Sequence, residues 1–199
     1  MNIMNKTFVF LGSSVTYGVD DYSMCEVVAE QTGAAVVKWA VSGTTLSASC
    51  PNSYVKRMLD VIDAQDACDH FICQLSTNDA GRGCPLGEIS DSFDAADFDT
   101  NTTLGAMEFI IATARARWSC PISFYTSYPF PSDKYPLMVE KLHEIAEKWE
   151  IGILDLWNDA EMQTVTPEDY AVFMRDPCHP TVLGYQKWWG PKFIDYLTK

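Results

Sequence analysis

The turn Gly12–Gly18 holds the first residues of this sequence that could do chemistry. Ser13, Ser14 and Thr16 lie in it between two glycines, directly after an apolar run. The glycines permit tight backbone geometry, and the hydroxyls and amide N–H groups could serve a serine nucleophile or cradle a phosphate group. Both kinds of site stay open at this point.

An aspartate and a histidine near the C-terminus could act on such a serine. Asp176 and His179 each precede a proline, which disfavours helical backbone and predicts a constrained loop. On a turn, the carboxylate can reach the imidazole N–H, fix its tautomer and stabilise the imidazolium. His70 begins a predicted strand and His143 falls on a predicted exposed helix face, so His179 is the best placed histidine.

Along the chain, short β-forming runs alternate with segments in which apolar residues have helical spacing. The predicted strands are Thr7–Leu11, Ala35–Val41, His70–Leu75, Pro121–Ser127 and Ile151–Leu156. The predicted helices are Asp21–Gln31, Asn52–Gln65, Asn101–Trp118, Pro136–Trp149, Thr181–Trp189 and Pro191–Leu197, with a break or kink near Gly190 and Pro191. This alternation predicts a three-layer α/β sandwich: a five-stranded parallel sheet with helices on both faces.

Polar turns follow the first three predicted strands. Ser13 and Ser14 follow the first strand, Gly43 the second and Asn78 the third. Ligands of open α/β sheets bind at the carboxyl ends of the strands, so we expect these residues to share one rim. The glycine-, proline- and acid-rich residues 80–100 have the length of a functional lid, although a plain solvated loop is the preferred interpretation.

Length and composition limit the class of protein. A chain of 199 residues can bury one core, and we predict one domain over residues 1–199. With 47% hydrophobic and 21% charged residues the composition is that of a globular protein, and the net charge of −13 argues against nucleic-acid or anionic-membrane partners. No apolar signal segment precedes the first strand and no 18-residue apolar run occurs, so we expect a cytoplasmic protein.

The seven cysteines are interpreted as free thiols. Their number is odd, no C-x-x-C pair occurs and their spacing fits no zinc module, so we expect neither a metal nor a cofactor. Cys178, beside His179, could itself be considered as a nucleophile. Adjacent residues on extended backbone point apart, which disfavours that hypothesis.

Four segments in order resemble the sequence blocks of the SGNH hydrolases, the GDSL-type esterases and acylhydrolases. They are Gly12–Gly18, the turn at Gly43, Ser76-Thr77-Asn78-Asp79, and Asp176-Pro177-Cys178-His179-Pro180. The resemblance covers essentially the whole chain. It implies Ser14 as nucleophile, His179 as general base and Asp176 as its orienting partner, with an oxyanion hole formed by the N–H groups of Ser14 and Gly43 and the amide of Asn78.

Two residues depart from the family pattern. Ser13 stands where the family commonly has Asp, and Ser76 stands where it commonly has the glycine of a G-x-N-D block. Neither carries a proposed reacting atom, so we expect effects on loop support and rate rather than on mechanism.

The resemblance implies a serine esterase or acylhydrolase that cleaves a small carboxylic ester through an acyl-enzyme. We expect a short acyl chain, with an acetylated carbohydrate as one candidate substrate. One alternative is a flavodoxin-like electron carrier, whose flavin phosphate would bind in the loop Gly12–Gly18. The other is a catalytically silent binding protein on the same fold.

Overall fold

The computed structural model describes residues 3–199 and is built on one parallel sheet. Its strands are β1 (Thr7–Gly12), β2 (Ala35–Ala40), β3 (His70–Gln74), β4 (Ile122–Tyr125) and β5 (Gly152–Leu154). They pair in the order β2-β1-β3-β4-β5, and every pairing is parallel. The predicted five-stranded parallel sheet is therefore confirmed.

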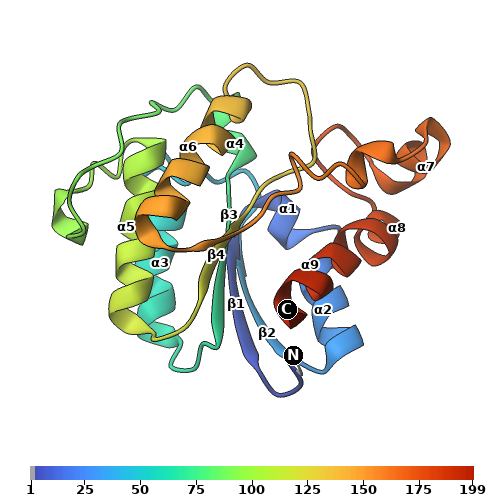
Figure 1. Cartoon of the computed structure of the whole chain (residues 1–199), viewed down its shortest axis with the longest axis horizontal. Helices are drawn as coiled ribbons and strands as arrows, with labels where there is room; N and C mark the ends of the chain where they lie inside the picture. The colour runs from blue at the N-terminus through green and yellow to red at the C-terminus, as the bar shows by residue number, and fades with distance from the viewer. Residues whose placement is uncertain (1–2) are drawn as a thin grey trace.

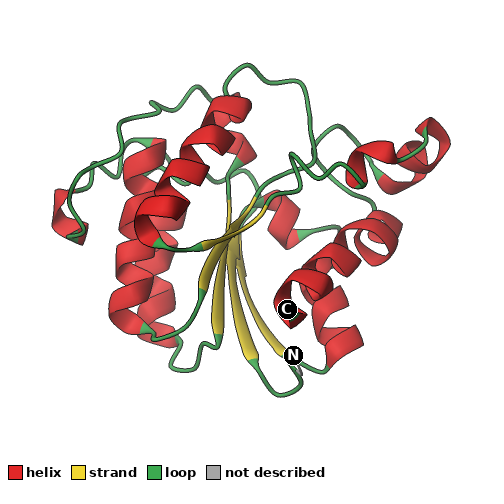
Figure 2. Cartoon of the chain, viewed as in Figure 1, coloured by secondary structure: helices red, strands yellow, loops and turns green. Residues whose placement is uncertain are grey.

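Helices cover both faces of the sheet (Figures 1 and 2). The longer ones are α2 (Met24–Thr32), α3 (Tyr54–Ala64), α5 (Thr103–Arg117), α6 (Tyr135–Trp149) and α9 (Gly190–Thr198). Figure 1 shows α3, α5 and α6 on one side of the sheet and α2 and α9 on the other. A hydrophobic core lies on each face of the sheet, and the side chains of β1 alternate between them. Val9 and Leu11 pack in the core beneath α3, α5 and α6, and Phe8 and Phe10 pack in the core beneath α2 and α9. The predicted three-layer arrangement is confirmed.

Local hydrogen bonds decide where the helices begin. Asp21, the predicted start of a helix, has a left-handed φ of 67° and lies outside it. α2 begins at Met24 instead, because Ser23 and Glu26 form a capping box: the Glu26 carboxylate accepts the Ser23 N–H at 2.7 Å. The predicted boundary was therefore wrong by three residues, although the helix itself is present.

Two segments predicted as turns are one-turn helices at the carboxyl edge of the sheet. They are α1 (Ser14–Tyr17), directly after β1, and α4 (Thr77–Gly81), after β3. At the end of β1, Gly12 packs so closely on Thr16 that a Cβ would overlap the Thr16 hydroxyl. This position therefore requires glycine, because only its missing side chain lets α1 fold back onto the strand.

The C-terminal part of the chain carries two short helices that were not predicted, η2 (Met162–Thr164) and α7 (Pro167–Phe173), and one altered junction. The short helix α8 spans Val182–Gly184, and the π-helical turn η3 spans Tyr185–Trp189. A break or kink was predicted near Gly190 and Pro191. The chain does not break there: α8, η3 and α9 follow one another directly, and the irregularity is the widened π-helical turn that precedes Pro191 at the start of α9.

Residues 82–102 cross the surface beside α5 and α6 and contain only the short η1 (Ala95–Asp97). They are held by a buried ion pair between Glu108 and Lys148. Lys148 also donates to the carbonyls of Ser90 and Ser92 at 2.6 Å, and Glu108 accepts the Ser90 N–H at 2.9 Å. This segment is therefore anchored to two helices over its middle part.

No helix within residues 3–199 combines the length and apolar character needed to cross a bilayer.

Candidate active site

Ser14 is the first residue of α1, at the point where β1 delivers the chain to the edge of the sheet. Its Oγ lies 2.8 Å from Nε2 of His179, a residue 165 positions later in the chain. The N–H of Ser14 lies in the first turn of α1, where backbone donors have no partner inside the helix. Ser14 therefore presents a hydroxyl hydrogen-bonded to an imidazole, and a backbone donor beside it.

Asp176 holds the other side of the imidazole. Its two carboxylate oxygens lie 2.8 and 2.9 Å from Nδ1 of His179. The same carboxylate accepts the backbone N–H groups of Cys178 and His179, each at 2.9 Å. Burial alone would raise the pKa of Asp176, but these hydrogen bonds and the imidazole outweigh it and lower that pKa below its ordinary value. The carboxylate is therefore ionised at neutral pH and fixes Nδ1 as the protonated nitrogen.

The loop that carries this pair is closed by backbone pairing. Met174 and Pro180 form an antiparallel bridge, and the Arg175 N–H donates to the His179 carbonyl at 2.8 Å.

Burial and the neighbouring Asp176 carboxylate raise the pKa of the Cys178 thiol to about 11. That thiol stays protonated at neutral pH and is a poor nucleophile.

The turn Gly43–Thr44 and Asn78 lie together at the same edge of the sheet. Gly43 has a φ of 76°, a left-handed conformation that favours glycine. The side-chain amide of Asn78 donates to the Thr44 carbonyl at 3.0 Å. An amide has two N–H groups, so this bond fixes its orientation and leaves the second for another acceptor. Each of the three strand-end segments predicted to share a rim lies at this edge.

Arg57, on α3, connects the ends of β1 and β2 to the Gly43–Thr44 turn. No role was assigned to it from the sequence. Its Nη2 donates to the Gly12 carbonyl and to the Thr44 hydroxyl, both at 2.9 Å, and Nη1 donates to the Trp39 carbonyl. The guanidinium is buried, and burial lowers its pKa, yet arginine keeps its charge in proteins. A buried cation therefore fixes the ends of β1 and β2 against the Gly43–Thr44 turn.

The two departures from the family pattern have structural partners. Ser13 donates its N–H to Gln74 Oε1 at 2.8 Å. Ser76 caps α4, with its Oγ accepting the N–H groups of Asn78 at 3.2 Å and Asp79 at 3.4 Å. Both serines therefore support the loops that present Ser14 and Asn78.

Asp79 and Gln74 are further supporting residues for which the sequence analysis proposed no role. The buried Asp79 carboxylate accepts the N–H groups of Leu46 at 2.7 Å and Ser47 at 3.1 Å, which follow the Gly43–Thr44 turn. Gln74 Oε1 accepts the Thr16 hydroxyl at 2.8 Å in addition to Ser13. A polar residue inside an apolar strand was the available signal for Gln74, and the fourth position of the Ser76–Asp79 segment was the signal for Asp79.

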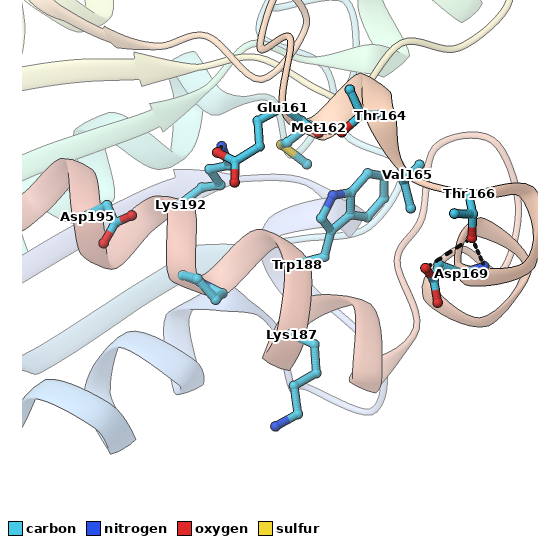
Figure 3. A pocket seen from close by; sticks show the side chains of 11 residues that line it. Glu161, Met162, Thr164, Val165, Thr166, Asp169, Lys187, Trp188, Lys192 and Asp195 are labelled. Atoms are coloured by element: carbon cyan, nitrogen blue, oxygen red, sulfur yellow. Dashed lines mark hydrogen bonds and ion pairs between the residues drawn. The ribbon is translucent and has the colours of Figure 1, made fainter.

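A cavity of about 340 Å³ opens elsewhere, between η2, α7 and the run of η3 and α9 (Figure 3). Figure 3 shows Trp188 between Glu161 and Lys192 on one side and Thr166 and Asp169 on the other. Among the described residues, its lining includes neither Ser14 nor His179. Over residues 3–199, no group of three His, Cys, Asp or Glu side chains is arranged to hold a metal ion.

A serine, a histidine and an aspartate joined by hydrogen bonds at the edge of a parallel sheet form the arrangement of an α/β serine hydrolase. Sequence comparison gives the family. A model of the GDSL-like lipase/acylhydrolase family matches residues 10–187, and the chain belongs to that family. The resemblance to the SGNH hydrolases is thereby confirmed. No curated protein matches the chain in sequence.

Solved structures with the same fold come from several bacteria. A Lactobacillus plantarum protein superposes with a TM-score of 0.79 at 19% identity, covering 98% of each chain. An inhibitor-bound aryl esterase from M. smegmatis gives 0.64 at 12% identity, over 97% of this chain and 98% of that one. A family two carbohydrate esterase from Clostridium thermocellum, in complex with cellohexaose, gives 0.67 at 13% identity, over 98% of this chain and 64% of that one.

Proposed function

We propose that the protein is a serine esterase that cleaves small carboxylic esters through an acyl-enzyme intermediate. The observation that carries the proposal is the continuous hydrogen-bonded series from Ser14 Oγ to His179 and on to Asp176. Membership of the GDSL-like lipase/acylhydrolase family supports a hydrolase.

In the proposed reaction, Ser14 is the nucleophile and His179 the general base. Because Asp176 holds the proton on Nδ1, Nε2 is free to take the Ser14 proton as Oγ attacks the ester carbonyl. The protonated His179 then gives that proton to the leaving alcohol, and the acyl group stays on Ser14. A water molecule, deprotonated by His179, attacks the acyl-enzyme, releases the carboxylic acid and restores the serine.

The negative charge that develops on the carbonyl oxygen needs fixed donors. We assign these to the N–H groups of Ser14 and Gly43 and to the second N–H of the Asn78 amide. The Thr44 carbonyl, which orients that amide, and the buried Arg57, which holds the turn, would keep the donors in place before substrate binds. Preorganised donors of this kind contribute because they need not rearrange in the transition state.

The proposed substrates have short acyl chains. The neighbours of similar fold include an aryl esterase and a carbohydrate esterase seen with cellohexaose, which supports esters of phenols or of carbohydrates as starting points. An acetylated carbohydrate is therefore one candidate natural substrate.

The proposal is tested by hydrolysis of p-nitrophenyl esters from acetate to decanoate. We expect wild-type activity to be greatest with short chains and to be lost in Ser14→Ala and in His179→Ala. Circular dichroism of each variant checks that it is folded. Full activity in Ser14→Ala would refute the assignment, and inactivity of the folded wild type towards every ester would favour the silent binding protein.

The flavodoxin-like electron carrier is a weaker candidate. A flavin phosphate in the loop Gly12–Gly18 would leave the hydrogen bonds between Ser14, His179 and Asp176 without a function. The visible spectrum of the purified protein distinguishes the two, because a bound flavin makes the protein yellow.

A further inference from the structure

The Gly43–Thr44 turn lies between two arginines. Arg57 holds Thr44 from the buried side, with Nη2 at 2.9 Å from the Thr44 hydroxyl. Arg82 approaches Gly43 from the exposed side: its Nη2 lies 3.4 Å from the position that a Cβ on Gly43 would take. Arg57 therefore bonds the segment that holds one of the proposed oxyanion donors, and the Arg82 guanidinium lies next to it.

Arg82 reaches this position because of its place on α4. It caps the C-terminus of that helix, and its N–H donates to the Asn78 carbonyl at 2.9 Å. The Asn78 amide bonds the Thr44 carbonyl and the Arg82 guanidinium lies next to Gly43, so both side chains face the Gly43–Thr44 turn. The cation therefore lies beside the place where the ester carbonyl would bind.

The Arg82 guanidinium has no structural partner within the described residues. It is exposed, and within the described part of the chain it has neither an ion pair nor a hydrogen bond from its side chain. Other cations are engaged: Lys38 contacts Asp21 and Glu26, and Lys192 contacts Asp159 and Glu161. In a chain with a net charge of −13, an unpaired arginine at the site is conspicuous.

We propose that Arg82 binds an anionic group of the substrate, so that the preferred ester carries a carboxylate within reach of this guanidinium when Ser14 attacks the ester carbonyl. A guanidinium matches a carboxylate through two parallel hydrogen bonds. The rest of the acidic surface repels anions, so a local cation is needed to hold such a substrate. This inference rests on the esterase function proposed above.

The carboxylate could belong to the acyl part or to the alcohol part of the ester, and paired substrates separate the two. For the acyl part, the mono-p-nitrophenyl ester of adipic acid is compared with p-nitrophenyl hexanoate. For the alcohol part, 4-acetoxybenzoate is compared with its methyl ester. Each pair differs by one negative charge at nearly constant size, and the same substrates without enzyme give the background rate.

The measured quantity is kcat/KM for the charged ester divided by kcat/KM for its neutral partner. We expect Arg82→Gln to lower this ratio about two- to fivefold for one of the two pairs, because the ion pair that Arg82 would form is exposed to solvent. The change is expected mainly in KM. Added salt is expected to lower the wild-type ratio, since Arg82 is exposed and its attraction is screened.

Lys199→Gln is the matched control. It removes one exposed positive charge near the N-terminal ends of the strands, beside Lys6 and Asp69, away from the edge that carries Ser14. We expect it to leave both ratios unchanged. Hydrolysis of the neutral esters with equal ratios in wild type and Arg82→Gln would overturn the inference while leaving the esterase function intact. An equal fall of the ratio in Lys199→Gln would also overturn it, because the effect would then be one of overall charge. Hydrolysis of none of the esters would instead contradict the proposed function.

Discussion

Asp176→Asn removes one charge from the site and keeps its shape. The Asp176 carboxylate has three donors around it: the N–H groups of Cys178 and His179, which both bind Oδ1, and Nδ1 of His179. In the variant, the amide oxygen must stay at the Oδ1 position, because the two backbone N–H groups can only donate. The amide nitrogen then takes the Oδ2 position, 2.9 Å from Nδ1.

Two N–H groups facing each other at that distance repel. The amide oxygen at the Oδ1 position, 2.8 Å from Nδ1, can still accept a proton there, but the amide N–H bonds Nδ1 only when the imidazole proton lies on Nε2. The tautomer with its proton on Nε2 therefore becomes populated, and in it Nε2, 2.8 Å from Ser14 Oγ, can no longer accept the serine proton. The variant also loses the charge that stabilises the imidazolium. We expect kcat to fall by about 10⁴, the loss that this change causes in a serine protease triad. The effect on the free energy of unfolding should be at most about 1 kcal/mol, because the Asp176 side chain is 43% exposed.

The assay is steady-state hydrolysis of p-nitrophenyl acetate by wild type, Asp176→Asn and Ser14→Ala, with urea unfolding of each protein in parallel. The rate at which a fluorophosphonate labels Ser14 should fall with kcat, since labelling needs the same proton transfer. The reasoning is refuted if Asp176→Asn is as stable as wild type and keeps more than about a tenth of its kcat, a loss far below that of a triad.

Three further predictions concern other parts of the structure. Asn78→Ala should lower kcat by about 10²–10³ with KM nearly unchanged, as loss of one oxyanion donor does, and a loss confined to KM would contradict the role assigned to the amide. Lys148→Met leaves Glu108 buried without its cation and should cost about 3–5 kcal/mol in urea unfolding, whereas the double variant with Glu108→Leu should recover part of the loss. Burial lowers the pKa of His70 to about 4. Between pH 6.5 and 4 the unfolded chain therefore binds a proton that the folded protein does not, and the free energy of unfolding should decrease as the pH is lowered from 6.5 to 4. His70→Asn should flatten that dependence, and equal slopes in wild type and His70→Asn would exclude His70 as the cause.

The sheet could be predicted from the sequence because each strand is a short apolar run that ends at a polar turn. Thr7–Leu11 is buried on both faces, and such a run has few other ways to fold. The prolines after Asp176 and His179 likewise place both residues on one short loop, where the structure has them in contact. These features follow from local chemistry, so one sequence is enough to anticipate them.

Other features depend on contacts between distant parts of the chain. Arg57 lies on an amphipathic helix, where a cation usually faces solvent, and only the packing of α3 beneath the Gly43–Thr44 turn buries it. Arg82 follows a turn-like segment whose helical character could not be seen before Ser76 was known to cap it. The start of α2 differs for a local reason: Asp21 is a residue type that often begins helices, but the capping box formed by Ser23 and Glu26 sets the true start at Met24.

The hydrogen bond between Ser14 and His179 joins residues 165 positions apart, one near each end of the chain. In the proposed reaction this pair works only when both parts of the chain are in place, since η3 and α9, which follow the loop that carries His179, pack against α2, which follows Ser14. Turnover is therefore a readout of completed folding. During refolding, hydrolytic activity should return no earlier than the slowest structural signal. A substitution that loosens the C-terminal helices should lower the activity in proportion to the fraction of molecules in which Ser14 and His179 are separated.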